Sequence, residues 1–257
     1  MISEKPWNRE VLLLLVVGLM VCWCIGMLLA VLLEHFLPIE ALARKNFYSF
    51  LVSILCGHGA GVFLIWQFLK LHGMTWAGFL GLDQPRVQRA ILFAVLVAIL
   101  VLPIVIMLNG WSADLIEKAL GMKPEPQPTI KVLQTSITLG ERICFGIAAI
   151  LFAPVFEEGL FRGILYPFIK QRGYPRLALF LTSFVFGAIH LSLVNLLPLT
   201  LLAMVLVLVY EKTDKLIAPM VTHAFFNSVN FFTFIYQAEV ERWLHHLGGW
   251  LRHFSGS

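Results

Sequence analysis

The sequence predicts an all-α integral membrane protein, a single polytopic bundle of about seven to eight transmembrane helices with amphipathic helices at the interface. Three observations predict this class. The 257 residues are 59% hydrophobic and only 13% charged, whereas a soluble domain is usually about a quarter charged. The mean hydropathy is +0.85. Long apolar runs recur along the chain, and a helix needs roughly 20 apolar residues to cross a hydrocarbon layer about 30 Å thick. The length fits one membrane domain, 1–257.

The predicted spans begin with an uncharged apolar run close to the N-terminus. This run is too long for the core of a signal peptide and lacks a small-residue cleavage site, so we expect it to be a retained anchor. Seven segments are candidate transmembrane spans: 11–33, 47–69, 90–108, 143–169, 177–194, 196–210 and 216–236. The last three are short and closely spaced.

Three segments outside these spans mix polar and apolar residues. Residues 74–89 are expected to lie at the interface. Residues 112–128 predict a short amphipathic helix followed by a proline-broken linker. Residues 237–257 repeat apolar residues at helical spacing and carry two adjacent glycines, which predicts an interrupted amphipathic surface helix.

The loop charges favour a cytoplasmic N-terminus by a small margin. That orientation places ten Lys and Arg residues on the cytoplasmic side and eight on the other side. The ten are Lys5, Arg9, Lys70, Arg86, Arg89, Lys170, Arg172, Arg176, Lys212 and Lys215. The net charge of +4 comes without a basic tract interleaved with aromatic residues, so we expect no nucleic-acid partner. The expected partners are the lipid bilayer and a substrate at the membrane.

Ionisable side chains inside transmembrane helices are costly, and by default they mark a functional site. Most of those in this chain fall in the last four spans, so residues 140–235 are predicted to hold the chemistry and residues 1–110 to act as scaffold. The polar set comprises His58, Glu157, Glu158, Arg162, His190 and His223, with the amides Asn195, Asn227 and Asn230.

Helix geometry separates the two adjacent carboxylates. Glu158 and Arg162 are four residues apart, the spacing at which side chains meet on one helix face, so they are predicted to form an ion pair. Successive helical residues are turned by about 100°, so Glu157 points elsewhere. It has Phe161 at the same spacing and lacks a local charge partner. Glu157 is therefore predicted to be the freer carboxylate, suited to act as a general base.

The histidines complete a hydrolytic set. His223 and Asn227 are four residues apart and project from one helix face. We expect Glu157 and His190 to hold and deprotonate a water molecule, while His223 and Asn227 donate hydrogen bonds to a developing oxyanion. Pro154, just before the glutamates, is expected to open the helix locally.

The remaining polar residues are expected to have structural roles. His58, in the glycine-rich stretch CGHGAG, is assigned to helix packing or to an adjacent cavity. Asn195 is interpreted as the N-cap of the sixth span. Asn230 is expected to assist Asn227 or to bond a neighbouring helix.

Three short stretches in successive spans carry a resemblance to a known family. EEGLFR fits the pattern EExxxR, FGAIH fits FxxxH, and HAFFN fits HxxxN. In this order they resemble the CPBP family of intramembrane glutamic endopeptidases, also called Abi or CAAX-protease-like, which includes the Ras-converting endopeptidase. The resemblance covers roughly residues 140–235.

The resemblance implies the same division of roles and no cofactor. Glu157 would activate water together with His190. Glu158 and Arg162 would orient Glu157 and brace the site, and His223 and Asn227 would form the oxyanion hole. The substrate would be a peptide or protein near the membrane. The substrates of the eukaryotic family members are lipidated. We expect a multi-pass protein of the inner or plasma membrane of a prokaryote.

Two alternatives stay open at the level of sequence. Some family members act without proteolysis, as scaffolds or in bacteriocin immunity, so the polar set could hold helices together or bind a partner. Alternatively, Glu157, His190 and His223 could form a carboxylate–imidazole zinc site of a membrane hydrolase, although the sequence lacks HExxH.

Overall fold

A computed structural model describes residues 2–36, 45–121 and 138–236, and every regular element in these ranges is helical, as predicted. The helices are α1 (Arg9–Phe36), α2 (Lys45–Ser53), α3 (Ala60–Leu71), α4 (Trp76–Leu80), α5 (Val87–Leu120), α7 (Leu139–Ile147), α8 (Ala153–Glu158), α9 (Tyr166–Lys170), α10 (Pro175–Ala188), α11 (Leu193–Thr213) and α12 (Ile217–Ile235). Three π-helical segments link some of them: η2 (Ile54–Gly59), η3 (Ala148–Phe152) and η4 (Gly159–Leu165).

Five described helices are long and apolar enough to cross a membrane: Arg9–Leu33, Phe47–Leu71, Val87–Ala119, Leu139–Lys170 and Leu193–Thr213. The prediction of an all-α membrane bundle is thus confirmed. The other two predicted spans are helical but fall outside this set. Helix α10 has only 14 residues, and α12 carries the polar residues of the HAFFN stretch, which lower its hydropathy. Leucines that a soluble protein would bury are widely exposed on α1 and α5, as a lipid-facing surface requires.

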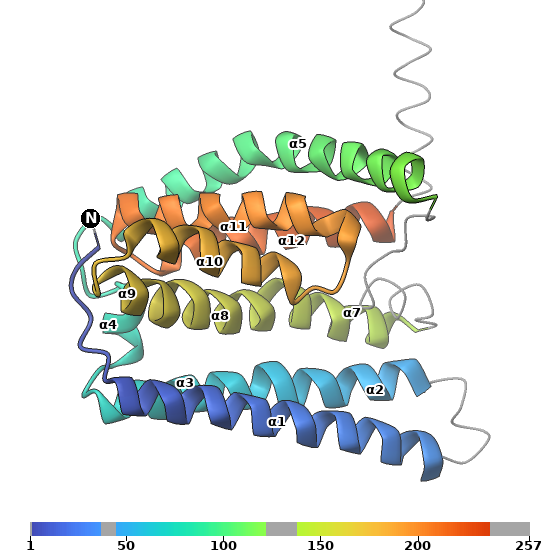
Figure 1. Ribbon diagram of the computed structural model, residues 1–257, viewed down its shortest axis with the longest axis horizontal. Coiled ribbons are helices and arrows are strands. Elements are labelled where there is room, and N and C mark those ends of the chain that lie inside the picture. Colours follow the sequence, from blue (N-terminus) through green and yellow to red (C-terminus); the bar gives the residue numbers. More distant parts are fainter. Residues whose placement is uncertain (1, 37–44, 122–137, 237–257) are drawn as a thin grey trace, which may run out of the picture.

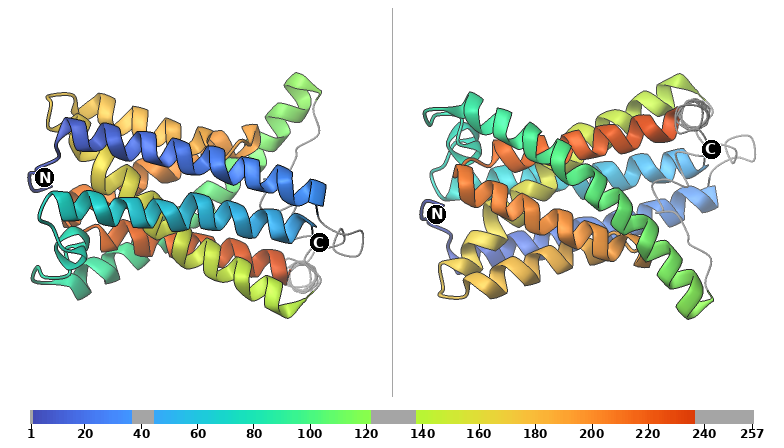
Figure 2. Two further views of the ribbon diagram at one scale, coloured as in Figure 1. Left: turned by 90° about the horizontal axis from the view of Figure 1, so that it is seen from below. Right: turned by 90° about the horizontal axis from the view of Figure 1, so that it is seen from above.

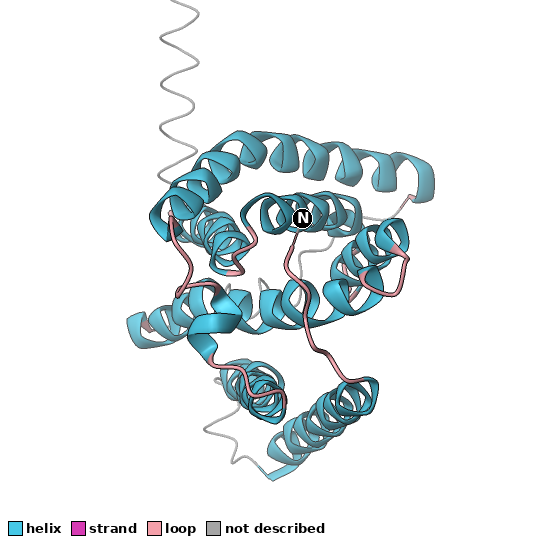
Figure 3. Cartoon of the chain, turned by 90° about the vertical axis from the view of Figure 1, so that its left-hand side faces the viewer, coloured by secondary structure: helices cyan, strands magenta, loops and turns pink. Residues whose placement is uncertain are grey.

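The rod that runs from α7 through η3, α8 and η4 to α9 lies in the middle of the bundle. Figure 1 shows it between the pair formed by α1 and the α2–α3 rod and a second group formed by α5, α10, α11 and α12. The end-on view in Figure 3 shows the same three-tier arrangement. Contacts join α8 to α3 and η2 on one side and to α12 on the other. The glutamates of α8 and most residues of η4 are buried between these neighbours.

Helix α5 corrects the expected boundary of the third span. Instead of a span ending near residue 108 and a separate amphipathic helix, one helix continues to Leu120 (Figure 2). No breaker stronger than Gly110 interrupts residues 109–120, so the helix propagates. It ends at Gly121, whose φ of 63° suits glycine and whose N–H donates to the Glu117 carbonyl. The linker after residue 121 and the predicted amphipathic tail at 237–257 lie outside the described residues.

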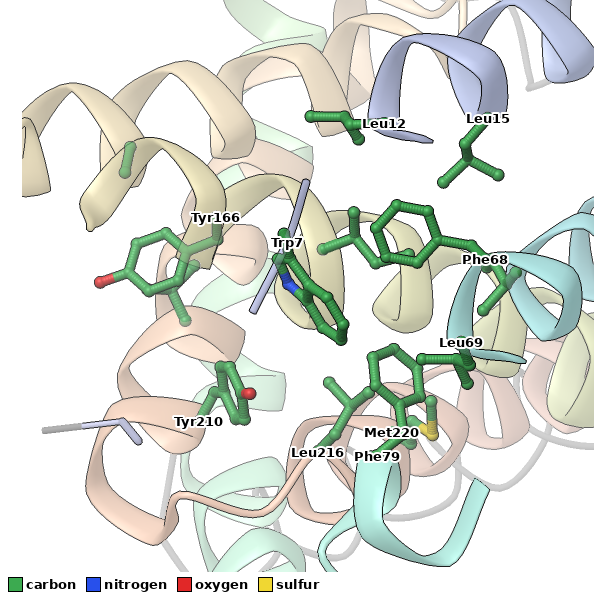
Figure 4. Close-up of a cluster of buried hydrophobic side chains, with 14 residues drawn as sticks. Trp7, Leu12, Leu15, Phe68, Leu69, Phe79, Tyr166, Tyr210, Leu216 and Met220 are labelled. Atoms are coloured by element: carbon green, nitrogen blue, oxygen red, sulfur yellow. The ribbon is translucent and has the colours of Figure 1, made fainter. Parts of the chain in front are cut away.

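A cluster of buried aromatic and aliphatic residues packs at the end of the bundle where α1 begins (Figure 4). Trp7 is at its centre and packs edge-on against Phe68 and Phe79. Its indole Nε1–H donates to the carbonyl oxygen of Gly163 at 3.0 Å. Gly163 lies in η4, one residue after Arg162, so the segment before α1 anchors the rod that carries the glutamates.

Candidate active site

Three π-helical segments surround the glutamates. A π-helical turn inserts one extra residue and frees backbone carbonyls from the ordinary α pattern, and such turns occur frequently at functional sites. Segment η3 ends just before Pro154, in the place where a local opening is predicted, and η4 begins directly after Glu158. Segment η2 contacts both η3 and α8. The irregular backbone of two separate rods therefore meets at Glu157 and Glu158.

Glu158 and Arg162 form the predicted ion pair. Arg162 Nη1 lies 2.8 Å from Glu158 Oε1, and neither residue has any exposed surface. The other terminal nitrogen, Nη2, donates to the Ala203 carbonyl of α11 at 2.9 Å. The guanidinium also lies 4.6 Å from the ring centre of Phe186 on α10. Arg162 therefore ties the central rod to two helices of the neighbouring group.

His223 binds the same oxygen of Glu158. Its Nδ1 lies 2.9 Å from Glu158 Oε1, and its Nε2 lies 3.8 Å from Glu157 Oε2. An ionised carboxylate can only accept, so Nδ1 carries the hydrogen and Nε2 donates only when the ring is an imidazolium. Two carboxylates and one guanidinium leave one negative charge in this buried cluster, which an imidazolium would balance.

Glu157 has imidazoles on both sides. Oε1 lies 3.5 Å from His58 Nε2 of η2, and Oε2 faces His223. Glu157 retains 9% exposure, whereas Glu158 retains none. The two adjacent carboxylates therefore differ as predicted: Glu158 is held by a guanidinium and an imidazole, and Glu157 has only longer contacts to two imidazoles.

His190 lies in a turn directly after α10, two residues beyond the end of the helix at Ala188, so the predicted span 177–194 ends earlier than expected. Its Nδ1 is 2.7 Å from the Phe186 carbonyl, which can only accept; Nδ1 therefore carries the hydrogen, and Nε2 is a free base when the ring is neutral. Phe186 packs against both His190 and His223.

Asn195 and Asn230 depart from their expected roles, whereas the role of Asn227 stays a prediction. One N–H of Asn227 donates to the Ala149 carbonyl of η3 at 2.8 Å, which leaves its second N–H for other acceptors. Asn195 is not the N-cap of α11, because that cap is Ser192. Asn195 instead donates to the Ser192 hydroxyl and accepts from Asn109 of α5. Asn230 donates to the Phe226 carbonyl of its own helix, and among the described residues it bonds neither Asn227 nor a neighbouring helix.

His58 is the residue of this cluster whose contact the sequence did not predict. The available signal was the glycine-rich stretch around it, which indicates close helix packing but does not identify the facing helix. Gly61 lies against Phe156, where an added Cβ would be 2.2 Å from Phe156 Cε2. Gly61 is in the first turn of α3, directly after η2, so this close approach of α3 and α8 also brings η2 near α8.

The zinc-site alternative gains no geometric support. In the part of the chain that the structure describes, no three His, Cys, Asp or Glu side chains come together in a group that could hold a metal ion. Glu157, His190 and His223 do not form such a set.

Comparison with known families finds a match within the second half of the chain. Residues 139–229 match the family described as type II CAAX prenyl endopeptidase Rce1-like. No curated protein and no solved structure gives a significant match. The matched segment contains Glu157, Glu158, Arg162, His190 and the HAFFN stretch, and it supports a CAAX-protease-like intramembrane endopeptidase.

Proposed function

We propose, from the premise that residues 139–229 form an Rce1-like segment of the CAAX-protease-like family, that this protein hydrolyses peptide bonds within the membrane with Glu157 as the general base on a water molecule. The observation that carries the proposal is the unequal environment of two adjacent carboxylates. Glu158 is fully buried and bound by Arg162 and His223, while Glu157 keeps some exposure and only longer contacts.

The water would be held between Glu157 and His190. His190 donates its Nδ1–H to a backbone carbonyl, so its Nε2 is available to accept a hydrogen bond from the water. Glu157 takes the water proton as the oxygen adds to the substrate carbonyl carbon. The burial of this cluster would give the base and the water a low-dielectric environment.

The oxyanion of the tetrahedral intermediate would accept hydrogen bonds from His223 and Asn227. His223 Nε2–H is a donor when the ring is an imidazolium, the state that balances the charges of the cluster. Asn227 retains one N–H beyond the bond to Ala149. Glu157 then passes its proton to the leaving nitrogen as the C–N bond breaks, which yields a new carboxyl terminus and a new amino terminus.

Glu158 and Arg162 support this chemistry without taking part in proton transfer. The guanidinium neutralises Glu158, and Glu158 in turn fixes the His223 ring through Nδ1. Residues 140–235 thus form the catalytic core, and the helices before residue 110 form the scaffold against which it packs. The substrate would be a peptide or protein segment that reaches the site from the membrane.

We also propose that the N-terminus is cytoplasmic. The end of α3, the turn after α9 and the end of α11 lie at the same end of the bundle as the start of α1 (Figure 1). They carry Lys70, Arg172 and Lys212, and basic residues favour the cytoplasmic side. A protease-cleavable tag at the N-terminus should resist external protease in intact cells. Cleavage of the tag under these conditions would contradict a cytoplasmic N-terminus.

The catalytic proposal is tested by comparative membrane proteomics. Membranes are compared from cells that express the wild type, Glu157→Gln, or the matched control Glu10→Gln, whose side chain is exposed on α1. New protein N-termini should appear with the wild type and the control and be absent with Glu157→Gln. The same set of N-termini in all three samples would contradict the proposal.

A further inference from the structure

His58 lies outside the family match and outside the residues assigned to catalysis, yet it is in contact with Glu157. Its Nε2 is 3.5 Å from Glu157 Oε1, just within hydrogen-bonding reach. Catalytic hydrogen bonds are often long before substrate binds and tighten afterwards. His58 is supplied by η2, a different rod from the one that carries the glutamate, so its contact is made by tertiary packing alone.

Local backbone structure presents His58 to the site. It lies in a π-helical turn between two glycines, and Gly57 is buried with Trp23 against it. Gly61, one turn later, allows Phe156 of α8 to approach closely. The Phe156 ring also meets the His58 ring edge-on, with centroids 5.3 Å apart. The imidazole is therefore held in one orientation by its neighbours.

The hydrogen-bonding pattern indicates which state of His58 fits. Nδ1 is buried and has no hydrogen-bond partner among the described residues. A buried N–H without an acceptor is costly, whereas an unused lone pair on a ring nitrogen costs less. The geometry therefore favours the tautomer with its hydrogen on Nε2, the nitrogen that lies 3.5 Å from Glu157 Oε1.

We infer that His58 is a positioning residue for Glu157: it holds Oε1, so that Oε2 is turned towards His223 and the reacting water. This inference rests on the proposed function of Glu157 as the base. His58 acts through Glu157 and does not itself exchange a proton with the substrate. The site would thus include one residue from the scaffold helices, His58, which would donate one hydrogen bond to Glu157.

The kinetic test compares His58→Ala, His58→Gln and the control His35→Ala, whose side chain is exposed on α1. The probe is an internally quenched peptide built on a cleavage site mapped by the proteomic comparison. His58→Ala should lower kcat on the order of 10- to 100-fold with KM little changed, because the base is mispositioned. His58→Gln, which keeps an N–H donor, should recover most of the loss and leave the pH profile unchanged. Full activity of His58→Ala, or equal losses in both variants, would overturn the inference.

A second measurement does not depend on catalysis. A double-mutant cycle of His58→Ala and Glu157→Ala is read from unfolding midpoints in detergent micelles. Non-additive shifts are expected because the two side chains interact, and additive shifts would overturn the inference. If Glu157→Gln proves fully active while the cycle shows coupling, the proposed function fails and the contact stands. If Glu157→Gln is inactive and the cycle is additive, only the role of His58 fails.

Discussion

Replacing Arg162 with Met removes the cation that balances Glu158 in the middle of the bundle. Both side chains are completely buried. The change breaks the 2.8 Å contact to Glu158 and the 2.9 Å hydrogen bond to the Ala203 carbonyl. Methionine is unbranched and fills irregular core space well, so the substitution mainly removes charge and hydrogen bonds.

The expected loss follows from these contacts. Removing one partner of a buried ion pair costs about 3–5 kcal/mol, because the remaining charge is uncompensated. That figure includes the lost bond to Ala203, since a single hydrogen bond contributes only about 1 kcal/mol. His223 lies 2.9 Å from the same carboxylate oxygen and limits the loss when its ring is protonated. We therefore expect Arg162→Met to lower the free energy of unfolding by about 3 kcal/mol or more.

The assay is unfolding by SDS in mixed micelles, with Arg89→Met as the control because Arg89 is exposed. The control should change the free energy by less than about 0.5 kcal/mol. The double variant Arg162→Met/Glu158→Gln should recover much of the loss, because a neutral amide oxygen still accepts from His223. The reasoning is refuted if Arg162→Met costs less than about 1 kcal/mol, or if the double variant is as unstable as the single one.

Three further predictions concern packing and charge. Trp7→Phe should lower the free energy of unfolding in the same micelles by about 1–3 kcal/mol, because the Gly163 carbonyl loses its buried donor; an unchanged value would contradict this. Gly61→Ala should cost about 1–3 kcal/mol through overpacking, since the new Cβ would lie 2.2 Å from Phe156, and adding Phe156→Leu should restore stability if that clash is the cause. Burial lowers the pKa of Lys5 below its usual value of 10.5 despite nearby carboxylates, so the unfolded chain binds the proton more tightly. Stability should then rise with pH between the lowered value and 10.5, and Lys5→Met should flatten that rise; equal slopes in both proteins would contradict it.

Local spacing was sufficient to predict the ion pair of Glu158 and Arg162. Both residues lie on one helical rod, so their meeting depends on backbone geometry that the sequence specifies directly. The same argument identified Glu157 as the carboxylate without a local cation. These two predictions required no knowledge of how the helices pack.

The spacing of residues along the chain could not predict the tertiary contacts. His58 meets Glu157 because two rods pack closely, and glycine-rich sequence indicates closeness without naming the partner. Asn195 was interpreted as a cap, but Ser192 is also a preferred cap residue and takes that position, which frees Asn195 to bond Asn109. The length of α5 was missed because its last turns change from apolar to amphipathic without a breaker.

The central claim is that Glu157, and not Glu158, activates the water. Its most direct test is the kcat of Glu157→Gln on the mapped quenched peptide, with Glu10→Gln as the control and unfolding measured in parallel. The account predicts a fall in kcat of about 10²- to 10⁴-fold, the usual contribution of a general base, with a folded protein and an unchanged control. A folded Glu157→Gln variant that retains the turnover of the wild type would contradict it.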